Sequence, residues 1–97
     1  MAVSVIVPFI SKLLLENDRV KVYELDLKPG EKTELHEHPD FVLYPLNDAV
    51  VRITPKGEKS RDVEMKTGEP RFMPAQWHVA ENTGRREARA LVIDLKK

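Results

Sequence analysis

The chain has 97 residues, of which 41% are apolar, and this size fits one domain with one modest core. Lysine and arginine together number 16, as do aspartate and glutamate, so the net charge is zero and nucleic acid is not an expected partner. The chain contains no cysteine, which excludes disulfides, thiolate metal ligands and a cysteine nucleophile and fits a cytoplasmic protein.

The first ten residues, Met1 to Ile10, are mostly apolar. They lack the basic start and the cleavage site of a signal peptide, and they are too few to span a bilayer. The segment therefore predicts a strand, and no membrane association is expected. Because an exposed apolar edge strand invites pairing with another chain, we expect Val3 to Ile10 to contribute to a homodimer.

The rest of the chain divides into short apolar runs separated by turn residues, a pattern typical of barrels and sandwiches. No window of helical length keeps a 3.6-residue stripe. Leu13 to Leu15 leaves a helical turn as an alternative to a strand there. The predicted fold is an all-β barrel or two-sheet jelly roll. The predicted strands are 11–16, 20–28, 33–38, 41–46, 49–54, 62–66, 71–73, 77–82 and 87–95.

The three histidines of the chain are the informative residues for function. His36 and His38 lie two apart on a predicted strand, so both imidazoles point to the same face and Glu37 points to the other. Two such rings can meet at one ion with bonds of about 2.1 Å. His78 could complete the site if the barrel brings its strand alongside. A His-x-His pair alone is weak evidence, because surface strands carry such pairs by chance.

The residues around the histidines strengthen the case. The sequence reads PGEKTELHEH over 29–38 and GEPRFMPAQWHVAENTG over 68–84. These stretches resemble the two motifs of the cupin superfamily, in which Gly, five residues and His-x-His come first. The second motif has Gly, five residues, Pro, and later His, three residues and Asn. The resemblance covers about residues 20–95. It implies one cupin domain over 1–97, a double-stranded β-helix, and a metal held by His36, His38 and His78.

Two departures from the family pattern matter. The glutamate ligand of the first motif should fall at Val42 or Leu43, and neither can bind a metal. In the second motif Gln76 lies nearest the place of the inner glycine, and His78 comes one residue early. Glu34 shares a strand face with His36 and could replace the missing carboxylate, although its place at the strand start favours exposure.

Three imidazoles with open positions resemble the sites of cupins similar to thiol and diketone dioxygenases. The expected cofactor is one divalent transition metal, Fe(II), Zn, Ni or Mn. Imidazole nitrogen suits such ions, and Cu as well, whereas Mg and Ca prefer oxygen ligands.

Three further residues are candidates for binding a substrate. If Val42 takes the place of the family's glutamate, alternation puts Tyr44 on the inward face, as a hydrogen-bond donor or as part of the barrel wall. Gln76 is placed to share a face with His78, and it could contact a substrate or cap a turn. Arg52 faces away from Val51 and Ile53, so it either binds a substrate carboxylate or is solvated.

The sequence therefore predicts a metal-binding cupin that acts on a small polar metabolite. Resemblance to the small dioxygenases favours a mononuclear non-haem iron oxidoreductase. Non-catalytic binding of a metal or small molecule, and metal-assisted isomerase or lyase chemistry, are the alternatives. No residue outside the histidines stands out as a general base.

Overall fold

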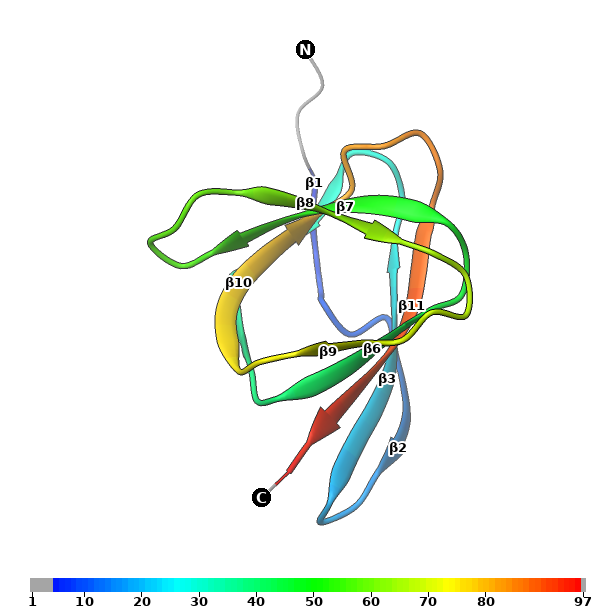
Figure 1. The fold of residues 1–97 in the computed structure, drawn as a ribbon, viewed down its shortest axis with the longest axis vertical. Coiled ribbons are helices and arrows are strands. Elements are labelled where there is room, and N and C mark those ends of the chain that lie inside the picture. The colour runs from blue at the N-terminus through cyan, green and yellow to red at the C-terminus, as the bar shows by residue number, and fades with distance from the viewer. Residues whose placement is uncertain (1–4, 97) are drawn as a thin grey trace.

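The computed structural model describes residues 5–96, which form eleven strands in two sheets and no helix (Figure 1). The first sheet has the order β1 (Val5–Val7), β4 (Glu31–Thr33), β10 (Gln76–Glu81), β7 (Ala49–Pro55), β8 (Arg61–Met65), and β5 (His36–His38) also pairs with β10. The second sheet has the order β2 (Lys12–Glu16), β3 (Val20–Leu27), β11 (Ala88–Leu95), β6 (Phe41–Pro45), β9 (Arg71–Met73).

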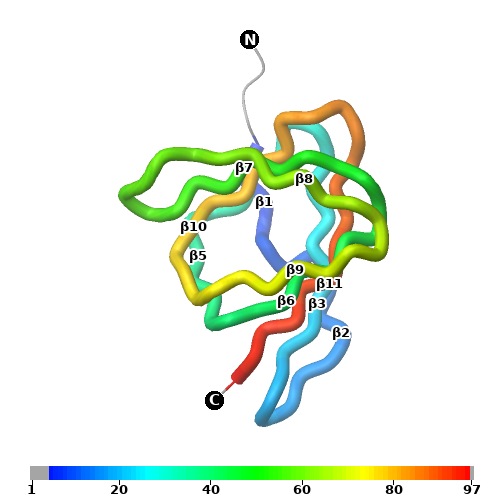
Figure 2. Tube along the Cα trace, viewed as in Figure 1, coloured from blue at the N-terminus to red at the C-terminus, as the bar shows by residue number. Residues whose placement is uncertain are grey.

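The two sheets wrap into a barrel, with the hairpin of β2 and β3 extending beyond it (Figure 2). All strand pairings are antiparallel except that of β1 with β4, which is parallel. The predicted all-β barrel is therefore confirmed. Among residues 5–96 no helix is long and apolar enough to cross a membrane.

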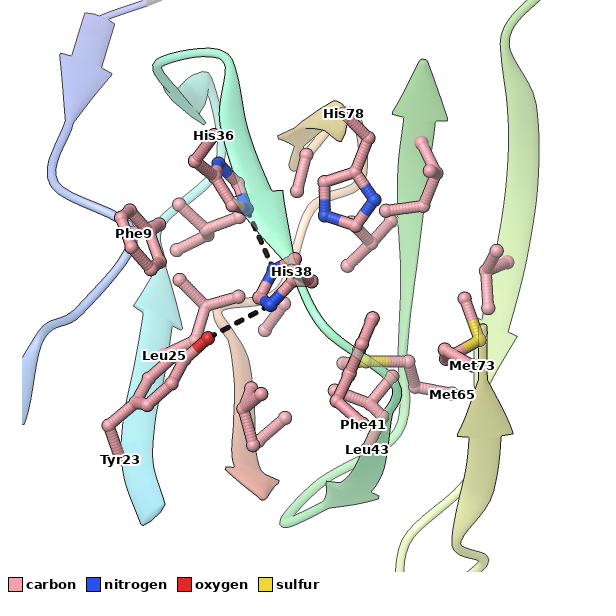
Figure 3. A pocket seen from close by; sticks show the side chains of 18 residues that line it. Phe9, Tyr23, Leu25, His36, His38, Phe41, Leu43, Met65, Met73 and His78 are labelled. Atoms are coloured by element: carbon pink, nitrogen blue, oxygen red, sulfur yellow. Dashed lines mark hydrogen bonds between the residues drawn. The ribbon is translucent and has the colours of Figure 1, made fainter. Parts of the chain in front are cut away.

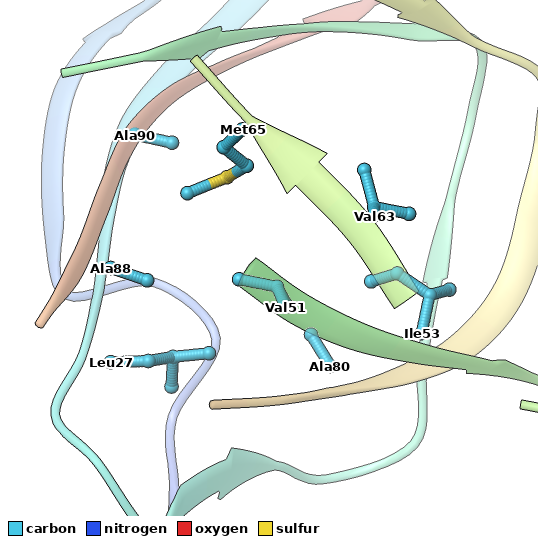
Figure 4. Packing of buried hydrophobic residues seen from close by; sticks show 8 residues of the cluster. All are labelled: Leu27, Val51, Ile53, Val63, Met65, Ala80, Ala88 and Ala90. Atoms are coloured by element: carbon cyan, nitrogen blue, oxygen red, sulfur yellow. The ribbon is translucent and has the colours of Figure 1, made fainter. Parts of the chain in front are cut away.

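Alternate residues of each strand face inward, and most of the inward-facing residues are apolar. In β7 the buried residues are Val51 and Ile53, and in β8 they are Val63 and Met65. Three alanines, Ala80, Ala88 and Ala90, face the same cluster (Figure 4). Because alanine fills little volume, these positions leave space inside the barrel beside the histidines.

Asn82 fixes the loop that follows β10. Its side chain is almost completely buried, and its amide nitrogen donates to the carbonyl oxygens of Leu27 at 2.8 Å and Arg86 at 2.7 Å. Its amide oxygen accepts from the backbone N–H of Gly84 at 2.9 Å. The asparagine of the second motif thus joins the loop to β3, and its role is structural.

The strand predicted over 33–38 is divided into β4 and β5 by Glu34 and Leu35. Both strands pair with β10, where Lys32 lies opposite Glu81 and His36 opposite His78. Four steps along one chain match three along the other, so one extra residue bends the strand as a bulge does. The hydroxyl of Thr33 accepts the N–H of Ala80 at 3.0 Å across this break. The bend aims His36 and His38 into the barrel.

The N-terminal predictions are confirmed in part. Residues 12–16 form strand β2, so the helical alternative for Leu13 to Leu15 is wrong. Val5–Val7 forms β1, the end strand of the first sheet. Residues 1–4 of the predicted N-terminal strand lie outside the described residues.

Candidate metal centre

The three histidines converge inside the barrel (Figure 3). His36 and His38 come from β5, and His78 lies directly opposite His36 on β10. Their relative exposures are 6%, 4% and 3%, and each offers a ring nitrogen within 4.8 Å of those of the other two. The convergence predicted from the two-residue spacing and the barrel is therefore confirmed.

Each histidine is held at its Nδ1 atom by a neighbour outside the cluster. Nδ1 of His36 lies 2.8 Å from the backbone oxygen of Glu34, and Nδ1 of His78 lies 2.8 Å from the side-chain oxygen of Gln76. Both oxygens only accept, so each of these Nδ1 atoms carries the proton. In a neutral ring the other nitrogen, Nε2, then presents a free lone pair.

The Nε2 atoms of His36 and His38 are 2.9 Å apart. Nδ1 of His38 lies 3.3 Å from a carboxylate oxygen of Asp94 and 3.2 Å from the hydroxyl of Tyr23. If it donates to Asp94, both Nε2 atoms present lone pairs to each other. Two lone pairs at this distance repel unless a proton or a metal cation lies between them.

Burial opposes protonation of His36 and His78. It lowers the pKa of His78 to about 3, with smaller contributions from the positive charges of His38, His36 and Arg61. Burial also lowers the pKa of His36. Neutral imidazole is the form that binds metals, so these rings are ready to ligate at neutral pH.

Aromatic rings fix the orientation of two of the histidines. Phe9, from the segment after β1, stacks on His36 with ring centroids 4.3 Å apart. Phe41 of β6 stacks on His38 at 4.2 Å. Such packing holds the imidazoles in one geometry and excludes water from their faces.

Comparisons with solved structures identify the fold. A cupin domain from Bordetella pertussis Tohama I is 26% identical, with a TM-score of 0.84 over 93% of this chain and 96% of that chain. An RmlC-like cupin family protein with a double-stranded β-helix fold from Methanocaldococcus jannaschii is 16% identical, with a TM-score of 0.72 over 88% and 77%. A cupin-like protein from Thermotoga maritima is 21% identical, with a TM-score of 0.68 over 88% and 66%.

This chain has the fold of a small single-domain cupin. The predicted double-stranded β-helix is therefore confirmed. No protein-family model matches the sequence, and no curated protein matches it.

The histidines of this cupin border a small apolar cavity of about 40 Å³. Apart from them and the Tyr23 hydroxyl, its lining is entirely hydrocarbon and methionine sulfur, including Leu25, Val63 and Met73. A volume of this size holds about two or three water molecules. The interior thus admits only a very small ligand or the end of a larger one, and it favours an apolar group.

The inward orientation predicted for Tyr44 is wrong. In β6 the residues that line the cavity are Phe41 and Leu43, whereas Tyr44 is 38% exposed and does not line it. Leu43 and Val42 leave the position of the family's glutamate apolar, as the sequence indicated. Glu34 is exposed, and its backbone oxygen rather than its carboxylate contacts His36.

Gln76 and Arg52 have different surroundings. Gln76 directly contacts His78 and shares its strand face, as predicted. Arg52 faces away from the cavity, also as predicted, and its Nε donates to the carboxylate of Asp62 at 3.0 Å. Contact of either residue with a substrate stays a prediction.

Asp94 and Tyr23 are the site residues that the sequence analysis missed. Asp94 is 8% exposed and lies beside His38, and Tyr23 is fully buried. Burial raises the pKa of Tyr23, and the negative charge of Asp94 raises it further, so the phenol stays neutral. A signal for Asp94 exists in the sequence, because it continues the inward alternation of Ala90 and Val92 along β11.

Proposed function

We propose that this cupin binds one divalent transition metal through Nε2 of His36, His38 and His78 and acts on a small metabolite at that ion. The convergence of three buried histidines, whose ring nitrogens lie within 4.8 Å of one another, carries the proposal. Two nitrogens bound at about 2.1 Å can be at most about 4.2 Å apart. The cluster spans up to 4.8 Å, so closing it around an ion requires a ring movement of about half an ångström.

The donor set fits such an ion. Three neutral imidazoles suit Fe(II), Zn, Ni and related ions, and each ring has a partner at Nδ1 that fixes its orientation. Asp94 contacts the ligand His38, and its negative charge offsets part of the charge of the dication. This carboxylate supplies from outside the ligand set what the family's glutamate supplies from within it.

An oxidoreductase that uses O₂ is the activity we favour: Fe(II) held by the three histidines would activate O₂, and the substrate would be oxidised and so supply the net electrons. The protein contributes a dry, apolar chamber beside the three histidines, which suits a small substrate with a hydrocarbon part. The polar metabolite expected from sequence is thereby narrowed to one that combines a polar group with a short hydrocarbon part.

Oxygen uptake tests this activity. Untagged protein loaded anaerobically with Fe(II) should consume O₂ when small thiols or diketones are added, and the same protein loaded with Zn should not. Absence of uptake with every substrate and metal would contradict the oxidoreductase. Turnover with Zn or Ni without O₂ would instead favour an isomerase or lyase.

A non-catalytic binding module is the second candidate. Among the residues that line the cavity, the histidines and Tyr23 are the only titratable groups, and each is engaged with a neighbour. A lining without a free acid or base favours binding over proton-transfer chemistry. Tight binding of metal or small ligand without turnover would support this candidate.

Replacing Asp94 with asparagine is expected to weaken Zn(II) binding by about 10–100-fold, the usual cost of losing the outer partner of a ligating histidine. Asparagine keeps the size of the side chain but loses its negative charge. Competition with a chromogenic chelator measures the affinity. Asp62→Asn, which removes the surface carboxylate paired with Arg52, is the matched control and should bind as tightly as the wild type.

We also propose that two copies associate through β1. Val5 and Ile6 are 59% and 63% exposed on the end strand of their sheet. Sedimentation of the Val5→Lys/Ile6→Lys variant should give a monomer where the wild type gives a dimer. Phe72→Lys, at the exposed edge strand β9, should leave the mass unchanged. A dimer that survives the double change would remove β1 from the interface.

A further inference from the structure

A polar depression of about 250 Å³ lies beside the histidine cluster. It is bordered by the connection from β7 to β8 and by the residues that lead into β10. Its charged residues are Glu58, Lys59 and Arg61, so two cations face one carboxylate. The depression therefore carries a net positive charge, in contrast to the apolar cavity inside the barrel.

Gln76 joins the depression to the histidines. It lines the depression, and its side-chain oxygen contacts Nδ1 of His78 at 2.8 Å. Its amide nitrogen donates to the backbone oxygen of Pro74 at 3.0 Å, which fixes the amide orientation. One side chain thus separates the positive depression from the ring of His78.

Arg61 is the residue of the depression that is aimed toward the site. It shares its strand face with Val63 and Met65, both of which line the cavity. Within residues 5–96 no carboxylate forms an ion pair with Arg61, whereas Arg52 on the neighbouring strand is paired with Asp62.

We propose that Arg61, supported by Lys59, binds the carboxylate of a small aliphatic acid. The guanidinium provides the two parallel donors that a carboxylate accepts. The acid's hydrocarbon part extends past Gln76 toward the apolar cavity, whose volume of about 40 Å³ limits it to a few carbon atoms. This assignment names the substrate class of the proposed metal site and rests on that function.

Binding of two matched probes tests the assignment. Butanoate and butanamide have the same size and differ in charge, and the side-chain amide of Gln76 reports their binding by NMR in Zn(II)-loaded protein. We expect wild-type protein to bind butanoate about tenfold more tightly than butanamide, a typical gain from a charge-assisted hydrogen bond at an exposed site. Arg61→Met should abolish this preference, and Arg61→Lys should restore part of it.

Arg52→Met is the control, because it removes one arginine from the same hairpin but from the outer face. It should keep the preference for butanoate. Equal preference in wild type and Arg61→Met, or equal loss in both methionine variants, would overturn the assignment.

The test also separates this assignment from the proposed function. Zn(II) affinity is measured first, and Arg61→Met should bind the metal as well as the wild type does. If the wild type binds no metal, the proposed function fails, and the probe series is repeated on metal-free protein. In the metal-free protein, a preference for butanoate that Arg61→Met abolishes supports the anion site. A preference that Arg61→Met retains overturns the site.

Discussion

Replacing His78 with alanine is expected to weaken Zn(II) binding by more than about 100-fold. Loss of a residue that only contacts a ligating histidine costs about 10–100-fold, and loss of the ligand itself costs more. The change removes one of three direct ligands, and it removes the one that β10 contributes to the site. Two imidazoles from β5 would remain, and they cannot enclose an ion from both sides. Elemental analysis of untagged protein and chelator competition measure the loss.

The same weakening of Zn(II) binding is expected for His36→Ala, because His36 contributes one of the two Nε2 atoms that lie 2.9 Å apart. In the metal-free state this variant should be less stable than the wild type, because it loses the stacking of His36 on Phe9. Glu34→Gln is the control. Its carboxylate is not in the cluster, so its affinity should match that of the wild type.

Retention of one equivalent of tightly bound metal by His78→Ala would contradict the three-histidine site. Loss of metal in Glu34→Gln would identify a carboxylate ligand that the cluster lacks. The comparison therefore tests both the ligands and the missing glutamate of the first motif. The chain has only these three histidines, so no other imidazole can substitute for a lost one.

The local order of the strands could be predicted from the sequence because it depends on neighbouring residues. The spacing of His36 and His38 sets their common face whatever the rest of the chain does. Turn signals at Pro29-Gly30 and Thr67-Gly68 coincide with turns in which Gly30 and Gly68 have φ of +86° and +75°. Glycine adopts this backbone conformation without the strain that other residues experience there.

Which side chains of β6 face inward could not be predicted from neighbouring residues in this way. No glutamate marks the inward position of this strand, and the choice of Val42 as inward put Tyr44 inward as well. A shift of one residue reverses every side chain of a strand. Pairing of Phe41 with Asp94 of β11 instead sets Phe41 and Leu43 inward.

The outer partners of the histidines depend on contacts between distant segments. Asp94 is 56 residues from His38, and only the pairing of β11 with β3 and β6 brings it there. Arg61 lies one residue before the strand predicted over 62–66, and its pairing opposite Ile53 of β7 places it on the face of Val63. Such residues follow from sheet register, which a single sequence specifies weakly.

The metal-free protein is expected to lose stability as the pH falls from 6.5 toward 3. Burial holds the pKa of His78 at about 3, below its value of 6.5 in an unfolded chain. Between pH 6.5 and pH 3 the unfolded state binds a proton at this histidine and the folded state does not, so acid favours unfolding. The pKa of His36 is shifted in the same direction and adds to the effect.

Asp26 acts in the opposite sense. Burial, together with the neighbouring Glu24, raises its pKa to about 6, so in mild acid the folded state takes up a proton before the unfolded state does. Its side chain is 30% exposed, and solvent screens this contribution. His78 is almost fully buried, so its contribution dominates and the net slope follows the histidines.

Urea unfolding at pH 7 and pH 5 measures the slope. Wild-type protein should lose up to about 1.4 kcal/mol per pH unit more than His78→Gln, which has no group to titrate at that position. Parallel losses in the two proteins would show that the buried ring does not resist protonation. Zn(II) should make the wild-type slope steeper, because protons then compete with the metal for the same nitrogens.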